Sequence, residues 1–232
     1  MHGTCQKTDP VRDLADRRIE TSRILTSEFF TELKSGGMNL ETFRRTQEQF
    51  YFAVEYFSRP MAALLMRLPT PEQRLSILAN VVEEHGSFEP RGFHEATFRE
   101  FLASIGSSPQ RPKPCGMGPQ VHAFNASIMA ACSCDDVHVG IACLGIIEYA
   151  FSDISALIGQ AVVERRWVKP DDLKHYRLHA ELDKQHAADF FALLEPAWND
   201  SAARSLIEQG FRLGTYVFDR LYRDLLATES PN

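Results

Sequence analysis

The sequence contains no long apolar run. The longest one, IACLGII at residues 141–147, is far too short to span a bilayer, which takes about 20 residues. The first 30 residues are charged, as in VRDLADRRIE, and lack the apolar core of a signal peptide. These absences predict a cytoplasmic protein that has no membrane as a partner.

Basic clusters and paired cysteines are also missing. The chain has 25 Lys and Arg residues against 31 Asp and Glu residues, and its net charge of −6 argues against a binder of phosphate backbones, so we expect no nucleic-acid partner. The five cysteines are an odd number without C-x-x-C spacing. They indicate reduced thiols in a cytoplasm and give no zinc signature.

No stretch alternates apolar and polar residues between hairpin turns, no repeat of fixed period occurs, and no linker divides the chain. The apolar residues instead follow the spacing of amphipathic helices along the whole chain. With 232 residues and a hydrophobic fraction of 44%, the chain can bury a full core. We predict a single all-α domain over residues 1–232, a bundle of seven or eight helices. The expected helical segments are 11–34, 40–68, 71–86, 91–105, 119–132, 135–166, 171–195 and 201–227.

Several boundaries have local signals. Gly36-Gly37 is typical of a helix end, and Asn39 can cap the helix that follows. Thr70, followed by Pro71 and by Gln73 at the third helical position, predicts a capped helix start. Pro60 should bend the second helix.

The most informative stretch is HAELDKQH at residues 179–186. Helical residues advance by about 100° each, so His179, Asp183 and His186 fall in a stripe roughly 60° wide on one helix face. All three side chains can bind a metal. The alternative is a solvated polar face, which would be the ordinary interpretation of this stripe taken alone.

Two other regions supply matching donors. Glu148 is the one carboxylate in the apolar segment GIACLGIIEYAF, and a buried carboxylate is normally paired, protonated or bound to metal. A hydrogen bond to Tyr149 is the plainer alternative. In NVVEEHGSFEPRGFHEATF, glycines and a proline break the helix between Glu84 and His94, so these two side chains can converge. Glu83 and His85 are adjacent alternatives.

These three elements in order resemble the heme-oxygenase-like diiron oxidases, of the superfamily of heme oxygenase, thiaminase II and pyrroloquinoline-quinone synthase. The elements are E-E-x-G followed by a His, a lone Glu in an apolar helix, and H-x-x-x-D-x-x-H. The resemblance implies a heme-oxygenase-like fold, two Fe(II) ions per chain, and O2 and a small molecule as reactants. The implied metal ligands are Glu84, His94, Glu148, His179, Asp183 and His186. No E-x-x-H occurs in the chain, which argues against a ferritin-like diiron site.

The resemblance also implies an oxidoreductase used in biosynthesis. An amino acid or amine is the expected substrate, for N-oxygenation or oxidative C–C cleavage, with Glu55, Tyr51 and Tyr149 as substrate-binding residues. The alternatives are a fatty-acid oxidative decarboxylase of the same fold and a thiaminase II-like, metal-independent hydrolase with a cysteine nucleophile. Aminobenzoate-forming members use a lysine and a tyrosine beside the metals, and no lysine lies within two turns after Glu148, which disfavours that activity. A homodimer stays open as an assembly.

Three further histidines are not assigned to the metal set. His175 lies on the same stripe one turn before His179 and is expected to be exposed or to support a ligand from behind. His122 and His138 have no companion donor and are expected to be structural.

Overall fold

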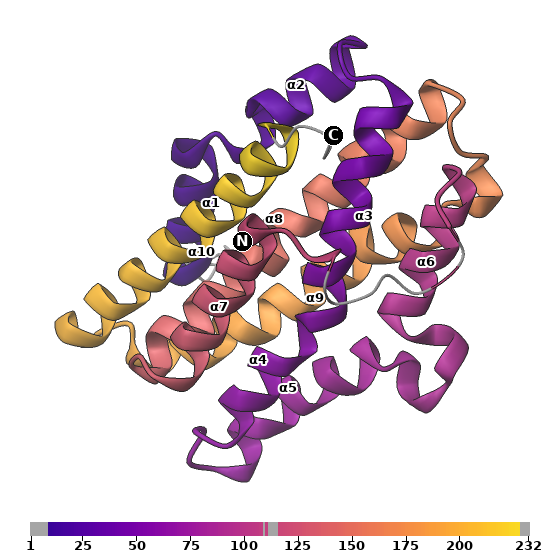
Figure 1. Cartoon of the computed structure of the whole chain (residues 1–232). Helices are drawn as coiled ribbons and strands as arrows, with labels where there is room; N and C mark the ends of the chain where they lie inside the picture. The colour runs from indigo at the N-terminus through magenta and orange to yellow at the C-terminus, as the bar shows by residue number, and fades with distance from the viewer. Residues whose placement is uncertain (1–8, 109, 111–115, 228–232) are drawn as a thin grey trace, which may run out of the picture.

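A computed structural model describes residues 9–108, 110 and 116–227, and Cys5 and Cys115 lie outside this part of the chain. The fold is all-α, as predicted. Figure 1 shows the helices, whose bounds are α1 Pro10–Ser22, α2 Glu28–Ser35, α3 Leu40–Tyr56, α4 Ser58–Leu65, α5 Pro71–Glu84, α6 His94–Ser104, α7 Pro119–Ser133, α8 Val137–Glu164, α9 Lys174–Leu194 and α10 Ser201–Ala227.

The helix α8 forms the centre of the bundle and packs chiefly against α9 and α10. Gly145 allows α9 to approach α8 closely, because a Cβ at this position would lie 2.8 Å from Cβ of Phe190. By length and composition α8 could cross a membrane, but 78% of its most apolar window is buried inside the protein. Its apolar character is therefore that of a core helix.

Two of the expected helices are each divided. Residues 11–34 form α1 and α2, because Arg23 adopts a left-handed conformation with φ of 56° and a short 3-10 turn follows. The helix after Asn39 divides at Phe57 into α3 and α4. The break precedes Pro60 by three residues because the proline ring displaces the carbonyl of the residue four positions earlier. The bend was predicted at Pro60 itself.

The predicted caps are confirmed. The Asn39 side chain accepts a hydrogen bond from the backbone N–H of Thr42, and Thr70 and Gln73 form a reciprocal capping box at the start of α5. Gly36, with φ of 92°, ends α2. These local signals set where the helices begin and end, and tertiary packing sets how they are placed around α8.

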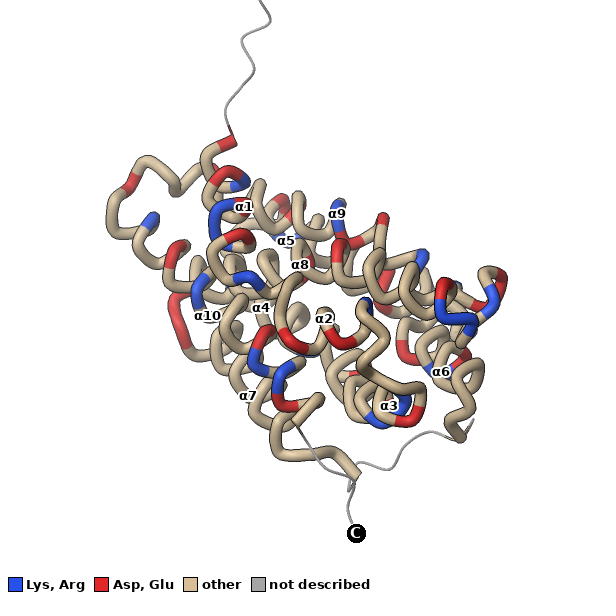
Figure 2. The backbone as a smooth tube through the Cα atoms, turned by 90° about the horizontal axis from the view of Figure 1, so that it is seen from above, with Lys and Arg blue, Asp and Glu red and all other residues tan. Residues whose placement is uncertain are grey.

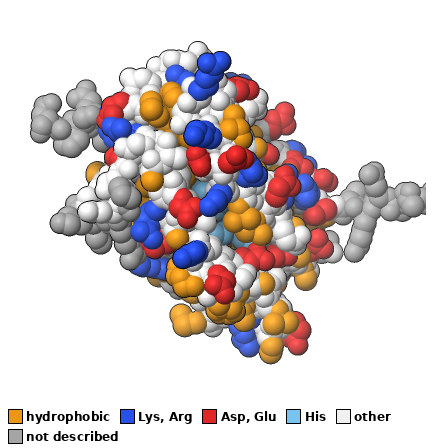
Figure 3. All heavy atoms as spheres, turned by 90° about the vertical axis from the view of Figure 1, so that its right-hand side faces the viewer, with side chains coloured by type: hydrophobic (Ala, Val, Ile, Leu, Met, Phe, Trp, Pro, Cys, Tyr) orange, Lys and Arg blue, Asp and Glu red, His pale blue; other side chains and the backbone are white. Residues whose placement is uncertain are grey.

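Charged residues of both signs are distributed over the outer helices, while α8 carries few of them (Figure 2). On the face shown in Figure 3, histidine side chains are visible near the middle, and acidic and basic side chains are mixed with apolar ones. The described side chains form no broad basic patch on that face.

Candidate metal centre

The connection between α5 and α6 brings Glu84 and His94 together. Glu84 is the last residue of α5 and His94 is the first of α6. Between them, His85 and Phe93 form an isolated antiparallel bridge. Gly86 has φ of +57°, and a Cβ there would lie 2.3 Å from the backbone carbon of Gly92, so only glycine closes this loop. Nδ1 of His94 consequently lies 2.8 Å from Oε1 of Glu84, as the broken-helix pattern predicted.

The opposite wall of the centre comes from α8 and α9. Glu148 projects from α8, while His179, Asp183 and His186 share one buried face of α9. Nδ1 of His179 lies 2.8 Å from Oδ1 of Asp183, and Nδ1 of His186 lies 3.6 Å from Oε1 of Glu148 and 3.9 Å from Oδ1 of Asp183. The stripe of donors is therefore turned into the core, and the solvated polar face is wrong.

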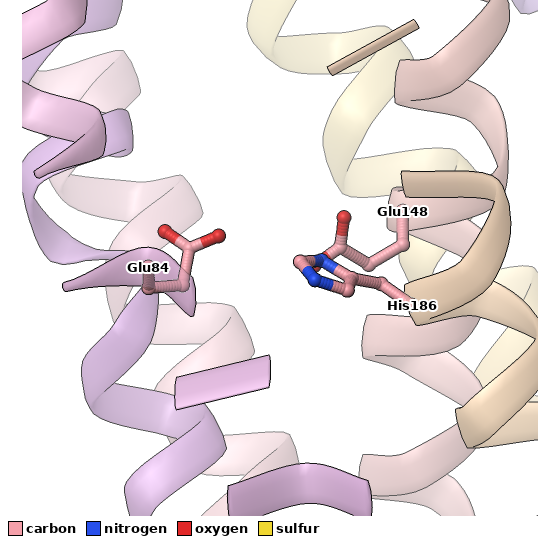
Figure 4. A group of neighbouring side chains, drawn as sticks. All are labelled: Glu84, Glu148 and His186. Atoms are coloured by element: carbon pink, nitrogen blue, oxygen red, sulfur yellow. The ribbon is translucent and has the colours of Figure 1, made fainter. Parts of the chain in front are cut away.

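Glu84 faces Glu148 and His186 across the space between the helices (Figure 4). One ligand atom from each of these three buried residues lies within 4.8 Å of the others, a spacing that could hold a metal ion. All six predicted ligands are buried. The contacts above join Glu84 to His94 and link the four residues of α8 and α9 to one another. The two groups meet where the ring centroids of His94 and His179 lie 4.3 Å apart. Their assignment as ligands stays a prediction.

Several oxygen and nitrogen atoms in this cluster that could bind a metal have no hydrogen-bond partner among the described residues. They are Oε1 of Glu148, Oδ2 of Asp183, Nε2 of His179 and Nδ1 of His186. Buried polar atoms are nearly always hydrogen-bonded, so an unpaired group of carboxylate and imidazole atoms is an arrangement that a cation satisfies. Hard carboxylates and borderline imidazoles fit iron or manganese better than copper(I) or structural zinc.

The electrostatics of the cluster also fit a cation. Burial, reinforced by Asp183, raises the pKa of Glu148 to about 7, although His186 opposes the rise. Burial likewise raises the pKa of Asp183 well above its usual value. At Glu84 burial also opposes ionisation, but His94, His179 and His186 together outweigh it and lower the pKa to about 2. Three carboxylates thus cannot share this site as anions without positive charge between them.

His186 has a second carboxylate partner outside the cluster. Its Nε2 lies 2.7 Å from Oε2 of Glu83, whose side chain is 40% exposed. Burial would lower the pKa of His186, but Glu148, Glu83 and Asp183 raise it to about 10. With Nε2–H donating to Glu83, Nδ1 is the nitrogen that would give up its proton to a metal at the centre, and a carboxylate behind a metal-bound histidine usually has this orienting role. From the sequence, Glu83 was only an alternative to Glu84.

A cavity adjoins the cluster. It contains about 440 Å³ of space not occupied by atoms, its mouth included, and its walls are mostly aromatic and aliphatic. The apolar lining residues are Phe50, Ala53, Val54, Phe57, Phe124, Ile147, Phe151 and Phe218, and the polar ones are Glu84, His94, Glu148, His175 and His179. His175 is fully buried, so of the two expectations for this residue exposure is wrong. Its position on the same helix face as His179 was the sequence signal that could have predicted its burial.

The three predicted substrate-binding residues lie elsewhere. The hydroxyl of Tyr51 donates to Glu95 at 2.8 Å, and Tyr149 donates to Asp16 on the outer side of α8. Glu55 lines a separate cavity with Arg59 and other residues of α3, α4 and α7. None of the three lines the cavity beside the cluster. For Tyr51 and Glu55 the reason is rotational, because each follows a cavity-lining residue of α3, Phe50 or Val54, and one step along a helix turns a side chain by about 100°.

The described cysteines do not contribute to the walls of this cavity. Cys132 and Cys143 are buried, and burial raises the pKa of both thiols, that of Cys143 to about 12. Cys134 is exposed. None of the three lines the cavity. A thiolate nucleophile of the kind a thiaminase II-like hydrolase requires is therefore disfavoured among the described residues.

The sequence of residues 44–217 matches a family described as iron-containing redox enzymes. This match covers more than half of the chain. The chain belongs to this family. Its membership agrees with the carboxylate and imidazole donors collected between α5, α6, α8 and α9.

Relatives of this member of the iron-containing redox enzyme family include proteins named 4-aminobenzoate synthase. The one from Chlamydia trachomatis serovar D is 23% identical over 195 residues, which are 84% of this chain and 83% of the relative. The one from Chlamydia pneumoniae is 21% identical over 183 residues, which are 79% of this chain and 80% of the relative.

Solved structures show the same fold. A TenA homolog from Pseudomonas syringae superposes with a TM-score of 0.75 at 14% identity, covering 94% of this chain and 92% of its own. A CADD-like protein of unknown function from Nostoc punctiforme gives 0.74 at 13% identity, covering 95% and 98%. A domain from Shewanella denitrificans with a heme oxygenase-like fold gives 0.73 at 16% identity, covering 92% and 90%. The fold is heme oxygenase-like, as the sequence motifs predicted.

Proposed function

We propose that the protein is an O2-activating, non-heme diiron oxidase or oxygenase that acts on a small organic substrate. The observation that carries this proposal is the buried cluster of Glu84, Glu148 and His186 with unsatisfied donor atoms, next to a cavity that is otherwise apolar. Membership in an iron-containing redox family supports it. A reduced, cytoplasmic setting belongs to the same proposal.

The residues that would hold iron are Glu84 and His94 on one side and His179, Asp183 and His186 on the other, with Glu148 between them. Bound iron(II) would supply electrons for dioxygen reduction and a Lewis-acidic point of attachment for substrate. The chain itself contributes negative charge, which offsets that of two divalent ions, and apolar walls that exclude water from the cavity. Glu83 orients the His186 ring through its Nε2–H.

The cavity walls indicate the shape of the substrate. Five phenylalanines surround the open space, and the described lining includes no Lys, Arg or Asp. A substrate with an apolar body and a small polar head at the cluster fits this lining. An amine, or an amino acid with an apolar side chain, therefore stays the preferred substrate, but Glu55 is not among the residues that line its proposed binding cavity. A fatty acid is the alternative that the same walls favour.

Formation of 4-aminobenzoate is a second candidate, favoured by the names of the relatives at 21–23% identity. The cavity argues against it, because neither lysine nor tyrosine is among the described lining residues. Expression in a bacterial strain that requires 4-aminobenzoate separates the two candidates. Growth without added 4-aminobenzoate would support the second candidate. If the strain does not grow although the protein is soluble and loaded with iron, the second candidate is wrong.

The proposed function is tested by measuring iron per chain and oxygen uptake after anaerobic loading with iron(II). We expect two irons per chain and uptake that an apolar amino acid or amine accelerates, with the product identified by mass spectrometry. Acceleration by lauric acid alone would favour the decarboxylase. Protein that is folded but binds no iron, or that does not consume O2 with any of these substrates, would contradict the proposal. The variant Asp183→Ala is the negative control.

A further inference from the structure

His175 differs from the other polar residues of the cavity. Glu84, His94, Glu148 and His179 line the same space and belong to the predicted ligand set, whereas His175 does not. Its side chain is fully buried, and its Nε2 has no hydrogen-bond partner among the described residues. A buried imidazole nitrogen without a partner is unusual, and because His175 lines the cavity, a molecule bound there can supply the missing hydrogen bond.

The hydrogen bonds around His175 fix its tautomer. The hydroxyl of Thr97 donates to the backbone carbonyl of His94 at 3.0 Å, and its oxygen lies 3.0 Å from Nδ1 of His175. A hydroxyl has one hydrogen, and that hydrogen is engaged with the carbonyl. Nδ1 of His175 is therefore the donor to Thr97, and in the neutral ring Nε2 is left with an accessible lone pair.

His175 is also set apart from the carboxylates. His94, His179 and His186 each have a carboxylate oxygen within 2.8 Å of a ring nitrogen, whereas no ion pair joins His175 to a carboxylate of the described residues within 4.0 Å. Its ring centroid lies 4.3 Å from that of His179 and 6.4 Å from that of His94. Phe98 and Tyr176 pack against its other sides. It therefore stands at the edge of the cluster, between the donors and the aromatic core.

We propose that His175 is a substrate-binding residue whose Nε2 accepts a hydrogen bond from an N–H or O–H group of the substrate. It is the one polar lining residue outside the predicted ligand set among the described residues, so it selects the polar head while the phenylalanines contact the apolar body. This inference rests on the proposed function, which places the substrate in the cavity beside the metal centre. It narrows the substrate to amines or alcohols that carry a hydrogen on nitrogen or oxygen. Ethers and tertiary amines are disfavoured, because a buried acceptor would lose its partner.

The test compares benzyl alcohol with benzyl methyl ether, two probes that share an aromatic body and differ in the hydrogen donor. Binding to the iron(II)-loaded protein is measured anaerobically by isothermal titration calorimetry, with iron per chain determined on the same samples. We expect His175→Leu to weaken benzyl alcohol roughly 10-fold, without weakening the ether and without loss of iron. His122→Leu, in the separate cavity, is the matched control and should change neither affinity.

Thr97→Val provides an independent variant outside the cavity lining. It removes the hydroxyl that fixes the tautomer, so it should also weaken benzyl alcohol selectively, and it tests the inference if His175→Leu does not fold. Equal losses for both probes, or lower iron content in either variant, would overturn the inference and make His175 a packing residue or a support of the metal centre. Wild-type protein that binds no iron would contradict the proposed function instead, and the probe comparison then remains readable on metal-free protein.

Discussion

Replacing Glu148 by glutamine should stabilise the metal-free protein and weaken iron binding at the same time. Glu148 is buried on α8 beside Asp183 and His186. Its pKa rises from an ordinary value of 4.5 to about 7. Because a tenfold change in an equilibrium constant is about 1.4 kcal/mol, this rise corresponds to about 3 kcal/mol that disfavours the ionised carboxylate in the folded protein.

The pH dependence follows from the sign of the shift. Below about pH 4.5 the carboxyl is protonated in both states and costs nothing. Between about pH 4.5 and 7 the unfolded chain ionises while the folded one does not, so stability falls as pH rises. Above about pH 7 the whole penalty is present. Glu148→Gln removes it, so the gain in unfolding free energy should approach about 3 kcal/mol at pH 8 and stay below about 1 kcal/mol at pH 5.

Chemical denaturation of chelator-treated protein at the two pH values measures this gain, and anaerobic competition with a chromophoric chelator measures iron affinity. We expect the variant to bind iron at least about 10-fold more weakly. Glu181→Gln, exposed on α9 beside Lys184, is the control and should change stability by less than about 0.5 kcal/mol. A variant that is destabilised at pH 8, or that binds iron as the wild type does, would refute the electrostatic reasoning.

Other expected outcomes concern the same centre. Asp183→Ala should lower iron binding and abolish oxygen uptake, because it removes a buried donor, whereas His138→Ala should do neither; normal loading of the first variant would show that the ligand assignment is wrong. Glu83→Ala should lower iron affinity about 10- to 100-fold in chelator competition. Glu72→Ala, which changes an exposed residue of the same helix, should not lower it. If the Glu83→Ala variant binds iron as tightly as the wild type, Glu83 does not position His186. Iron affinity should rise with pH. Because the pKa of Glu148 is raised to about 7, this carboxyl is partly protonated near neutrality and must lose its proton when it binds iron. Titration with iron(II) in weakly buffered solution at pH 6.5 should therefore release protons, and a flat pH trace would contradict this.

The sequence alone determined the helical fold class, most helix ends and the region where donors converge. Each of these depends on short-range physics. Glycine pairs and capping residues act within one turn, and the glycines and proline between Glu84 and His94 break a helix wherever it is packed. The spacing of His179, Asp183 and His186 fixes their common direction on α9, because a helix has one period.

Only the tertiary structure decided which faces meet. The helical period does not say how far a helix is rotated toward its neighbours, and on α3 a step of one residue turns a side chain by about 100°. Phe50 and Val54 therefore line the cavity while Tyr51 and Glu55 do not. The partnership of Glu83 with His186 joins residues 103 positions apart. Such a contact exists only once α5 packs against α9, and no pattern within either helix encodes it.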